Sequence, residues 1–389
     1  MILADKSRKL YKETFGSEGT RIFYSHGRLE LIGNHTDHQG GVCLVSGVNL
    51  GITAAVSTNK DGAVRFVSEG YAPFMFHTDE LQKKKGELGT TLALCKGVLF
   101  KMKEMGYKIG GFTCALVSDL PSGSGLSSSA AVEALICEIV DVLYNKGKMS
   151  PMDKAVVSQF AEREFFGKPC GLLDQIGVCY GGVVYVNFNQ EGKTYVEPLP
   201  YKLTLVPVLV NTGGSHAGLT HLYASIPEDM FSVARNLLGV EKLSDCTMRE
   251  FLERVCVPCD GVSERAKLRA QHYYDECRRV EDCRKALKEG DSSTFLQSIR
   301  MSQESSKGLL GNTMVPGQYQ KSPQQAVDIA NTIIGKGACR IMGGGFAGSI
   351  LCFVYPDDLK GFVAGMSKYY GEDAVTPLQI EEGGAKEVR

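Results

Sequence analysis

The sequence lacks the long apolar runs and the charge excess that would place it in a membrane or on nucleic acid. No window approaches the roughly 18 uninterrupted apolar residues needed to cross a bilayer, and the first twenty residues carry charges where a signal peptide has its apolar segment. Lys and Arg total 43 against 44 Asp and Glu, for a net charge of -1, and no stretch clusters Lys and Arg enough to hold a polyanion. We therefore expect a cytosolic protein with neither a membrane nor a nucleic acid as partner.

The sequence also lacks a cysteine pattern typical of a disulfide framework or a zinc site. Its 13 cysteines, an odd number, are scattered among apolar residues, as at Cys43 and Cys114, which is typical of reduced, buried thiols. Cys256 and Cys259 form a CVPC pair, but no second close pair follows it. We therefore expect no zinc site.

The composition that remains is that of an ordinary globular protein. The 389 residues are 43% hydrophobic and 22% charged, which allows two or three domains with a proper core. Apolar periodicity predicts strands and helices along the chain. The strands are expected as two short runs in Gly40–Ser57, then at Ala63–Val67, Gly111–Val117, Gly182–Phe188 and Leu203–Val210. The helices are expected at Thr91–Met105, from Ala130 onward, at Pro151–Phe165, in LLDQIG at 172–177, at Glu264–Ala286 and at Phe295–Ser306.

Beyond about residue 200 the predicted elements become charged, amphipathic helices, and we place a domain boundary near that residue. The helix around Arg278 and Arg279 is charged and is expected to present a solvated face. The acidic, glycine-containing tail at 381–389 is expected to fray.

A loop rich in glycine and serine stands between a predicted strand and a predicted helix. Residues Pro121–Ser129 read PSGSGLSSS. Glycines allow positive φ and close approach of backbone N–H groups, and a helix N-terminus attracts anions, so this junction is suited to phosphate. Ser129, expected last before the helix, could also bind a metal. The alternative is an ordinary serine cap after a flexible turn. The chain has no GxxxxGK[ST] loop and no HRD and DFG pair, which excludes two common kinds of phosphoryl-transfer enzyme.

A second segment, Gly27–Gly41, reads GRLELIGNHTDHQGG and concentrates hydrogen-bonding side chains around glycines. Recognition of several hydroxyl groups needs short donors and acceptors on a rigid turn, and Asn34, His35 and Asp37 supply them. The alternative is a polar surface turn.

Two further segments complete the pattern. AEREFFGKPCGLLDQIG contains Glu162, Gly171 and Asp174, and IMGGGFAG at Ile341–Gly348 is a second glycine-rich turn. A hydroxyl group is a poor nucleophile, so a carboxylate within hydrogen-bond reach would assist its attack on a phosphate. Taken alone, Asp174 fits a salt bridge on a helix surface, and the glycine turn fits close packing between domains.

Together these segments resemble the GHMP kinase family, and within it the galactokinases. Residues 121–130 match the family motif Pro-x-Gly-x-Gly-Leu-Ser-Ser-Ser-Ala, and residues 27–38 resemble the galactokinase signature Gly-Arg-x-Asn-Leu-Ile-Gly-Glu-His-Thr-Asp-Tyr. Residues 161–175 and 341–348 resemble two more family segments. The departures are His26 for proline, Glu30 for asparagine, Asn34 for glutamate, His38 for tyrosine and Ala347 for glycine.

The resemblance implies an α+β fold of two domains, 1–200 with a ribosomal-S5-like mixed sheet and 201–389 with a ferredoxin-like sheet, and with sugar and Mg-ATP in the cleft between them. It implies an ATP-dependent sugar-1-kinase that phosphorylates the C1 hydroxyl of galactose, with ATP as co-substrate and Mg²⁺ as cofactor. We expect a monomer or weak dimer. The catalytic residues implied are Asp174 and Arg28; the sugar ligands Arg28, Asn34, His35, Asp37, Gly171, Asp174 and Tyr223; the ATP-binding residues Pro121, Ser122, Gly123, Ser124, Gly125, Leu126, Ser127, Ser128 and Ser129; and the metal ligands Ser129 and Glu162.

Asn34 leaves the substrate open. The family glutamate at this position holds the C6 hydroxyl, whereas an amide is a weaker acceptor that can also donate. The alternatives are a kinase for another hexose, such as galacturonate or N-acetylgalactosamine, and a non-catalytic sensor of galactose and ATP. A sensor would be expected to have lost part of the serine loop or Asp174, and this chain keeps both.

Overall fold

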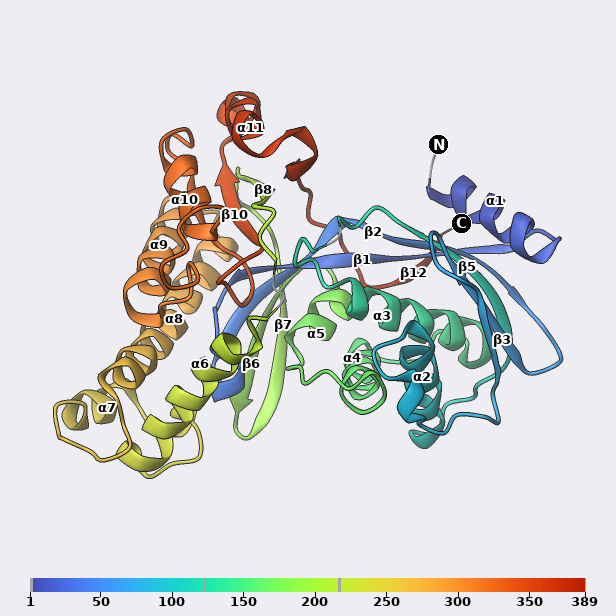
Figure 1. The fold of residues 1–389 in the computed structure, drawn as a ribbon, viewed down its shortest axis with the longest axis horizontal. Coiled ribbons are helices and arrows are strands. Elements are labelled where there is room, and N and C mark those ends of the chain that lie inside the picture. Colours follow the sequence, from blue (N-terminus) through green and yellow to red (C-terminus); the bar gives the residue numbers. More distant parts are fainter. Residues whose placement is uncertain (1–2, 122, 216–217, 389) are drawn as a thin grey trace.

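Two β-sheets with their helices make up the protein. The structure is a computed structural model that describes residues 3–121, 123–215 and 218–388 (Figure 1). The larger sheet has eight strands in the order β12-β1-β2-β5-β3-β4, with β6 paired to β2 and β7 to β6. It is mixed, because β3 and β5 are parallel and the other pairs are antiparallel. Its strands are β1 (Arg21–Ile32), β2 (Val42–Thr58), β3 (Ala63–Ser68), β4 (Phe74–His77), β5 (Phe112–Ser118), β6 (Val183–Gln190), β7 (Lys193–Leu199) and β12 (Lys386–Val388).

The central strand β2 corrects the expectation of two short runs in Gly40–Ser57. It is one strand of 17 residues. Val42–Ser46 pair with β6 and Ile52–Thr58 pair with β5, while β1 runs along its other edge. The small residues that suggested a break mark the point where β2 changes partners. Gly51 lies at this point, and a Cβ on Gly51 would be only 2.3 Å from Ser25 O.

Helices cover both faces of this sheet. One face carries α2 (Thr91–Glu104), α3 (Ser128–Val140), α4 (Pro151–Phe160) and α5 (Leu173–Tyr180), which share its apolar core. The other face carries the N-terminal helix α1 (Leu3–Phe15), packed through Tyr11 (Figure 1). The helix expected at Pro151–Phe165 begins at Pro151 but continues beyond Phe160 as a wider helical turn, Ala161–Phe166.

The smaller sheet has the antiparallel order β11-β8-β10-β9. Along the chain these strands run β8, β9, β10, β11, so the fourth lies beside the first and the third lies between the first and second, which is the ferredoxin-like arrangement. The expected ferredoxin-like sheet is therefore confirmed. Its elements and the nearby helices are β8 (Val206–Asn211), α6 (Thr220–Ser232), α7 (Met248–Arg254), α8 (Glu264–Glu289), α9 (Ser292–Ser305), α10 (Pro323–Asn331), β9 (Ala338–Ile341), β10 (Ser349–Val354), α11 (Pro356–Tyr370) and β11 (Val375–Pro377).

One apolar core joins the two sheets. Leu29 and Leu31 of β1 belong to the same buried cluster as Leu287 of α8, Phe295 of α9 and Leu351 of β10. On the opposite face of the smaller sheet, α10 and α11 form a separate core. The α+β class is thus confirmed. The boundary expected at residue 200 falls between β7 and β8 and stays a prediction.

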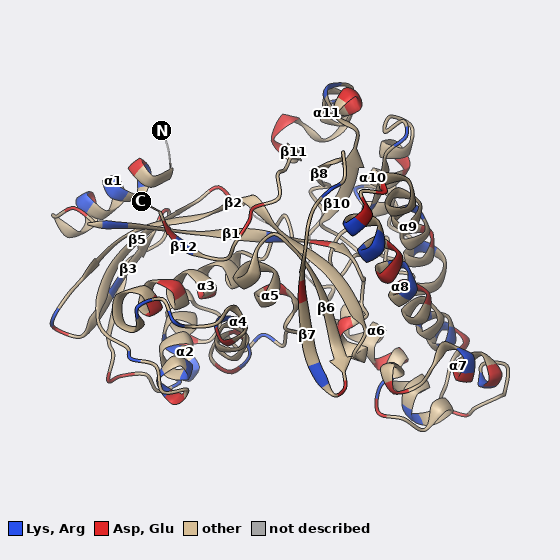
Figure 2. Ribbon diagram, turned by 180° about the vertical axis from the view of Figure 1, so that it is seen from behind, with Lys and Arg blue, Asp and Glu red and all other residues tan. Residues whose placement is uncertain are grey.

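The tail and α8 differ from expectation. Over its described residues, 381–388, the tail does not fray: β12 pairs with β1, and Arg21 Nε donates to Glu387 Oε1 over 2.5 Å. Acidic and basic residues are interspersed along α8 (Figure 2). Arg278 is exposed, but Arg279 is buried beside Glu276, so the expectation of a solvated face is wrong for Arg279.

Two observations bear on composition. Within the described ranges, no helix has both the length and the apolar character needed to span a bilayer. All 13 cysteines lie in those ranges and each is a free thiol.

Candidate active site

The glycine-serine loop lines a cavity of about 300 Å³ between β5 and α3. Both sheets hold the loop in place: Arg28 N of β1 donates to Leu126 O over 3.0 Å, and Ser349 Oγ of β10 donates to Ser124 O over 3.0 Å. Ser122, expected to bind ATP, lies outside the described residues. The cavity is lined by Arg28, Leu120, Pro121, Gly123, Ser124, Gly125, Leu126, Ser127, Ser128, Ser129, Lys168 and Asp174.

The N-terminus of α3 opens into this cavity. The helix begins at Ser128, two residues earlier than expected, so Ser129 lies in its first turn rather than before it. Ser127 occupies the cap position with a left-handed φ of 58°, and its side chain does not cap the helix. Because the first amides of a helix have no partner within it, they remain available to an anion here.

Arg28 and Asp174 meet at the opposite wall. Arg28 Nε and Nη2 both donate to Asp174 Oδ1, over 2.9 and 2.7 Å, and Arg28 Nη1 donates to Gly125 O over 2.5 Å. Ser127 Oγ donates to the other carboxylate oxygen, Asp174 Oδ2, over 2.7 Å. Burial alone would raise the pKa of Asp174, but the charge of Arg28 and these hydrogen bonds outweigh it and lower the pKa. Asp174 is therefore ionised at neutral pH. Its side chain is 32% exposed to solvent.

A second carboxylate, Glu162, lies at the base of α3. Its side chain is 1% exposed, and Ser129 Oγ donates to Oε1 over 2.9 Å. Lys168 Nζ lies 2.8 Å from the same oxygen, and Gln175 Nε2 donates to Oε2 over 2.7 Å. Burial lowers the pKa of Lys168, but the nearby Glu162 carboxylate outweighs burial and raises it. Lys168 was not among the residues expected at the site. Its position in the GKPCG turn, between Glu162 and Asp174, is the signal that could have found it.

Asp37, Gly171 and Asp174 form the side of the site nearest the segment 27–41. A Cβ on Gly171 would lie 2.6 Å from Asp37 Oδ2, so glycine is needed for this approach. Burial, followed by the charge of Glu30, raises the pKa of Asp37 to about 6. His35 lies nearby with a left-handed φ of 58°, and its Nε2 is 3.1 Å from Gly344 O. Burial lowers the pKa of His35, which favours its neutral form.

Asn34 is turned into the protein. Its side chain is buried, and Nδ2 donates to Glu30 Oε1 over 3.1 Å and to Gly343 O over 2.5 Å. Its Oδ1 accepts from Asn312 Nδ2 over 2.8 Å. All the polar atoms of this side chain are therefore used inside the fold. The structure does not bring Asn34 into the cavity with Arg28 and Asp174.

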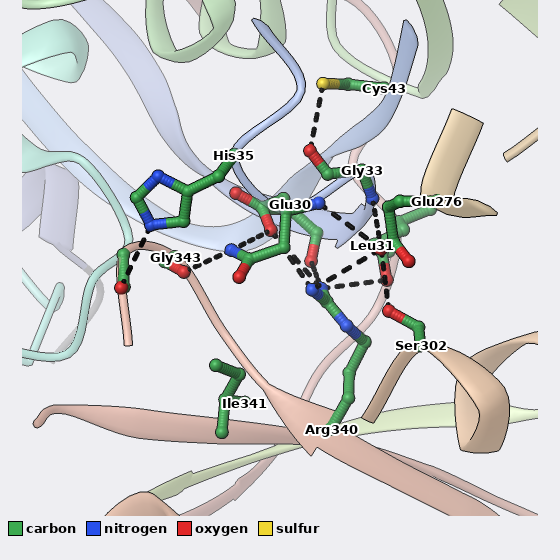
Figure 3. Close-up of polar contacts among 12 residues, drawn as sticks. Glu30, Leu31, Gly33, His35, Cys43, Glu276, Ser302, Arg340, Ile341 and Gly343 are labelled. Atoms are coloured by element: carbon green, nitrogen blue, oxygen red, sulfur yellow. Dashed lines mark hydrogen bonds and ion pairs between the residues drawn. The ribbon is translucent and has the colours of Figure 1, made fainter. Parts of the chain in front are cut away.

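A buried ionic network supports the turn that carries Asn34 and His35 (Figure 3). Glu276 Oε1 accepts from the backbone N–H groups of Gly33 and Asn34, over 3.2 and 3.3 Å, and from Ser302 Oγ over 2.6 Å. Arg340 Nη1 lies 3.3 Å from Glu30 Oε1, and neither Arg340 nor Glu276 is exposed. Nothing in the sequence indicated that Glu276 supports residues more than 240 positions away.

The glycine-rich turn 341–348 packs against Tyr223 of α6. Tyr223 Oη donates to Gly345 O over 2.9 Å, and a Cβ on Gly344 would lie 2.7 Å from the Tyr223 ring. The turn lies next to the phosphate loop, because a Cβ on Gly125 would meet Met342 Cε at 3.1 Å. Tyr223 thus lies beside the turn that holds Asn34 and His35, outside the residues that line the cavity.

Comparison with known proteins gives two matching family models. Residues 9–58 match the galactokinase galactose-binding signature, and residues 93–182 match the GHMP kinases N terminal domain. These ranges contain the segment 27–41 and the loop 121–129 described above.

Curated relatives match along almost the whole chain. The galactokinase of Clostridium perfringens is 28% identical over 377 residues, which cover 95% of this chain and 94% of the relative. The galactokinase of Lactococcus lactis is 26% identical over 396 residues, 97% of this chain and 95% of the relative.

Solved structures share the fold. Lactococcus lactis galactokinase complexed with galactose superposes with a TM-score of 0.84 at 24% identity, covering 100% of both chains. The mevalonate kinase of Methanococcus jannaschii superposes with a TM-score of 0.68 at 15% identity, covering 94% of this chain and 100% of that one. The expected GHMP kinase fold is thereby confirmed. Along almost its whole length the chain is similar to galactokinases, and its fold is that of the GHMP kinases.

Proposed function

We propose that this protein transfers the γ-phosphate of ATP to the C1 hydroxyl of galactose, giving galactose 1-phosphate and ADP. The observation that carries the proposal is the pairing of Arg28 with Asp174 at the mouth of the phosphate cavity, where Ser127 of the loop also donates to Asp174. A carboxylate fit to hold a hydroxyl thus lies beside amides fit to hold a phosphate. The galactokinase signature and relatives support galactose as the hydroxyl donor.

Asp174 acts on the C1 hydroxyl. As that oxygen bonds to the γ-phosphorus, the bond from phosphorus to the β,γ-bridging oxygen breaks and ADP leaves. A lowered pKa makes Asp174 a weak base, so it chiefly orients the hydroxyl and takes the proton only as the new bond forms and the hydroxyl becomes acidic. Arg28 stabilises the negative charge that develops on the transferred group.

The phosphates of ATP lie against the loop 121–129. The free amides at the start of α3 bind phosphate oxygens, and the hydroxyl of Ser128 adds a further donor. The left-handed backbone at Ser127 turns the loop so that its hydroxyl serves Asp174 while the following amides face the cavity.

Ser129 and Glu162 would hold Mg²⁺. Their oxygens lie 2.9 Å apart, and neighbouring ligands of an octahedral Mg²⁺ are about 2.9 Å apart, so the pair fits this cation. Bound there, Mg²⁺ would neutralise charge on the phosphates of ATP. The buried Gln175 amide holds Glu162 Oε2 and so orients the carboxylate.

The sugar lies between Asp174 and the 34–37 turn. Asp37, His35 and the backbone of Gly171 face this space as candidate ligands of the sugar hydroxyls, and Tyr223 supports the turn from α6. Because both polar atoms of the Asn34 amide are hydrogen-bonded inside the fold, Asn34 gives no support to a substrate modified at C6. A cytosolic location and a monomer or weak dimer stay predictions.

The proposal is tested by ADP release coupled to NADH oxidation with galactose, galacturonate, N-acetylgalactosamine and glucose in turn. We expect galactose to give the highest kcat/KM, and ³¹P NMR of the product to show phosphate on C1. Activity with none of the four sugars, while the protein is folded, would refute the proposal.

A further inference from the structure

Lys168 is a cation of the phosphate cavity to which neither the motifs nor the proposed reaction gives a role. It follows Gly167, whose φ of 88° ends the wider turn 161–166, and it precedes α5 with Asp174. Its side chain lines the same cavity as the loop 121–129 and Arg28. The side chain is 55% exposed, whereas its partner Glu162 is 1% exposed. Lys168 can therefore move without disturbing the packing around Glu162.

The charges in the cavity are balanced before any nucleotide enters. Arg28 is committed to Asp174 through two hydrogen bonds, and Lys168 is paired with Glu162. A polyphosphate brings several further negative charges into this space, and a buried or half-buried anion needs a cationic partner. Arg28 is held between Asp174 and Gly125 O. Arg28 and Lys168 are the cations that line the cavity, and of these Lys168 has the flexible, exposed side chain.

Glu162 can release Lys168 without being left unpartnered. Ser129 Oγ and Gln175 Nε2 continue to donate to its two oxygens. Lys168 Nζ and Ser129 Oγ bind the same oxygen, Oε1, so the ammonium stands beside the position where a cation bridging Ser129 and Glu162 would lie. The ammonium can therefore turn to another anion while both carboxylate oxygens of Glu162 stay hydrogen-bonded.

We propose that Lys168 is a phosphate-binding residue of the site: its ammonium pairs with Glu162 in the free protein and moves to the terminal phosphates when nucleotide binds. This inference rests on the proposed function, because it takes the nucleotide phosphates to lie in this cavity. Lysine suits the role, since a compact ammonium with three donors can follow phosphate oxygens as a point charge.

The test is calorimetric titration of ATP into the protein, once with EDTA and once with MgCl₂. The variants are Lys168→Met, which removes the charge, and Lys168→Arg, which keeps it. Lys288→Met is the matched control, because Lys288 Nζ pairs with Glu197 over 2.6 Å and is 44% exposed, outside the cavity. Thermal melting and titration of galactose establish that each variant is folded, and Lys168→Gln replaces the Met variant if that one is not.

We expect Lys168→Met to weaken binding of metal-free ATP about tenfold or more, the effect of losing one hydrogen bond to a charged group. Lys168→Arg should stay within about threefold of wild type and Lys288→Met within about twofold. Affinity of Lys168→Met for metal-free ATP equal to that of wild type would overturn the inference and leave Lys168 as a counterion of Glu162 alone. If the wild-type protein instead binds no ATP and phosphorylates no sugar, the proposed function itself fails, and this inference with it.

Discussion

Replacing Glu276 by glutamine tests whether a buried charge holds the turn 33–37, which we propose binds the sugar. Glu276 lies on α8, and its carboxylate accepts from the N–H group of Gly33 (Figure 3). It also accepts from the N–H group of Asn34 and from Arg279 Nε, the last over 2.8 Å. An amide at this position has one acceptor oxygen in place of two, and its NH₂ group would face N–H donors. Glu276→Gln should therefore leave at least one buried donor unpartnered and loosen the turn.

The size of the effect follows from the pKa of Glu276. Burial would raise this pKa, but Arg279, His272, Arg340 and Ser302 outweigh burial and lower it from 4.5 to about 2. Because the folded-state pKa is depressed, the stabilisation is full above the unfolded value and is lost as the pH falls from about 4.5 towards about 2. The difference of about 2.5 units corresponds to about 3 kcal/mol of unfolding free energy near neutrality, falling to about 2 kcal/mol at pH 3.5.

The assay is urea denaturation of the wild-type and Glu276→Gln proteins between pH 3.5 and 7.5. Glu289→Gln is the control, because Glu289 is exposed on the same helix and its nearest lysine is 4.0 Å away; its effect should stay within about 0.5 kcal/mol. We also expect the KM for galactose to rise in Glu276→Gln, since His35 and Asp37 follow the loosened turn. A loss below about 1 kcal/mol at pH 7, or one that does not shrink at low pH, would refute the reasoning.

Three further predictions concern the site itself. Asp174→Asn should lower kcat at least a hundredfold while galactose binding, measured by calorimetry, changes severalfold at most, because a neutral amide still hydrogen-bonds but cannot accept the proton; wild-type kcat would contradict the assignment. Because the pKa of Asp37 is about 6, galactose should bind about tenfold more weakly at pH 5 than at pH 7.5, and Asp37→Asn should abolish this pH dependence; an equal dependence in the variant would exclude Asp37 as its source. Gly171→Ala, whose Cβ would lie 2.6 Å from Asp37 Oδ2, should raise the KM for galactose about tenfold and leave that for ATP unchanged, and a rise confined to ATP would contradict the placement.

The sequence predicts those parts of the candidate site that are formed by residues close together along the chain. The loop 121–129 and its helix are contiguous, so glycine, serine and helical periodicity predict the anion site directly. The pairing of Arg28 with Asp174 joins residues 146 positions apart. It was expected only because both residues match family motifs, since no spacing rule brings β1 to the start of α5.

The buried ionic network that supports the turn with Asn34 and His35 could not be predicted in the same way. Glu276 and Arg279 are spaced as an ordinary surface pair on a helix, and Arg278 is indeed exposed. What buries Glu276 and Arg279 is the approach of the 33–34 turn and of Arg340 from remote parts of the chain. Helical periodicity reports one helix face and carries no information on what packs against it.

The tail was misjudged for a similar reason. Its glycines and charges are typical of a frayed end, yet β1 offers an open edge whose backbone groups need partners, and residues 386–388 fill it. The stabilisation of the tail depends on pairing with the neighbouring strand β1, so the composition of the tail does not predict it.

A crystal structure with galactose and a non-hydrolysable ATP analogue tests the central claim most directly. The account predicts the C1 oxygen within about 2.6–3.2 Å of an Asp174 carboxylate oxygen, with the phosphates against the first turn of α3. A sugar whose C1 hydroxyl points away from Asp174, or phosphates bound outside the cavity lined by the loop 121–129, would contradict it.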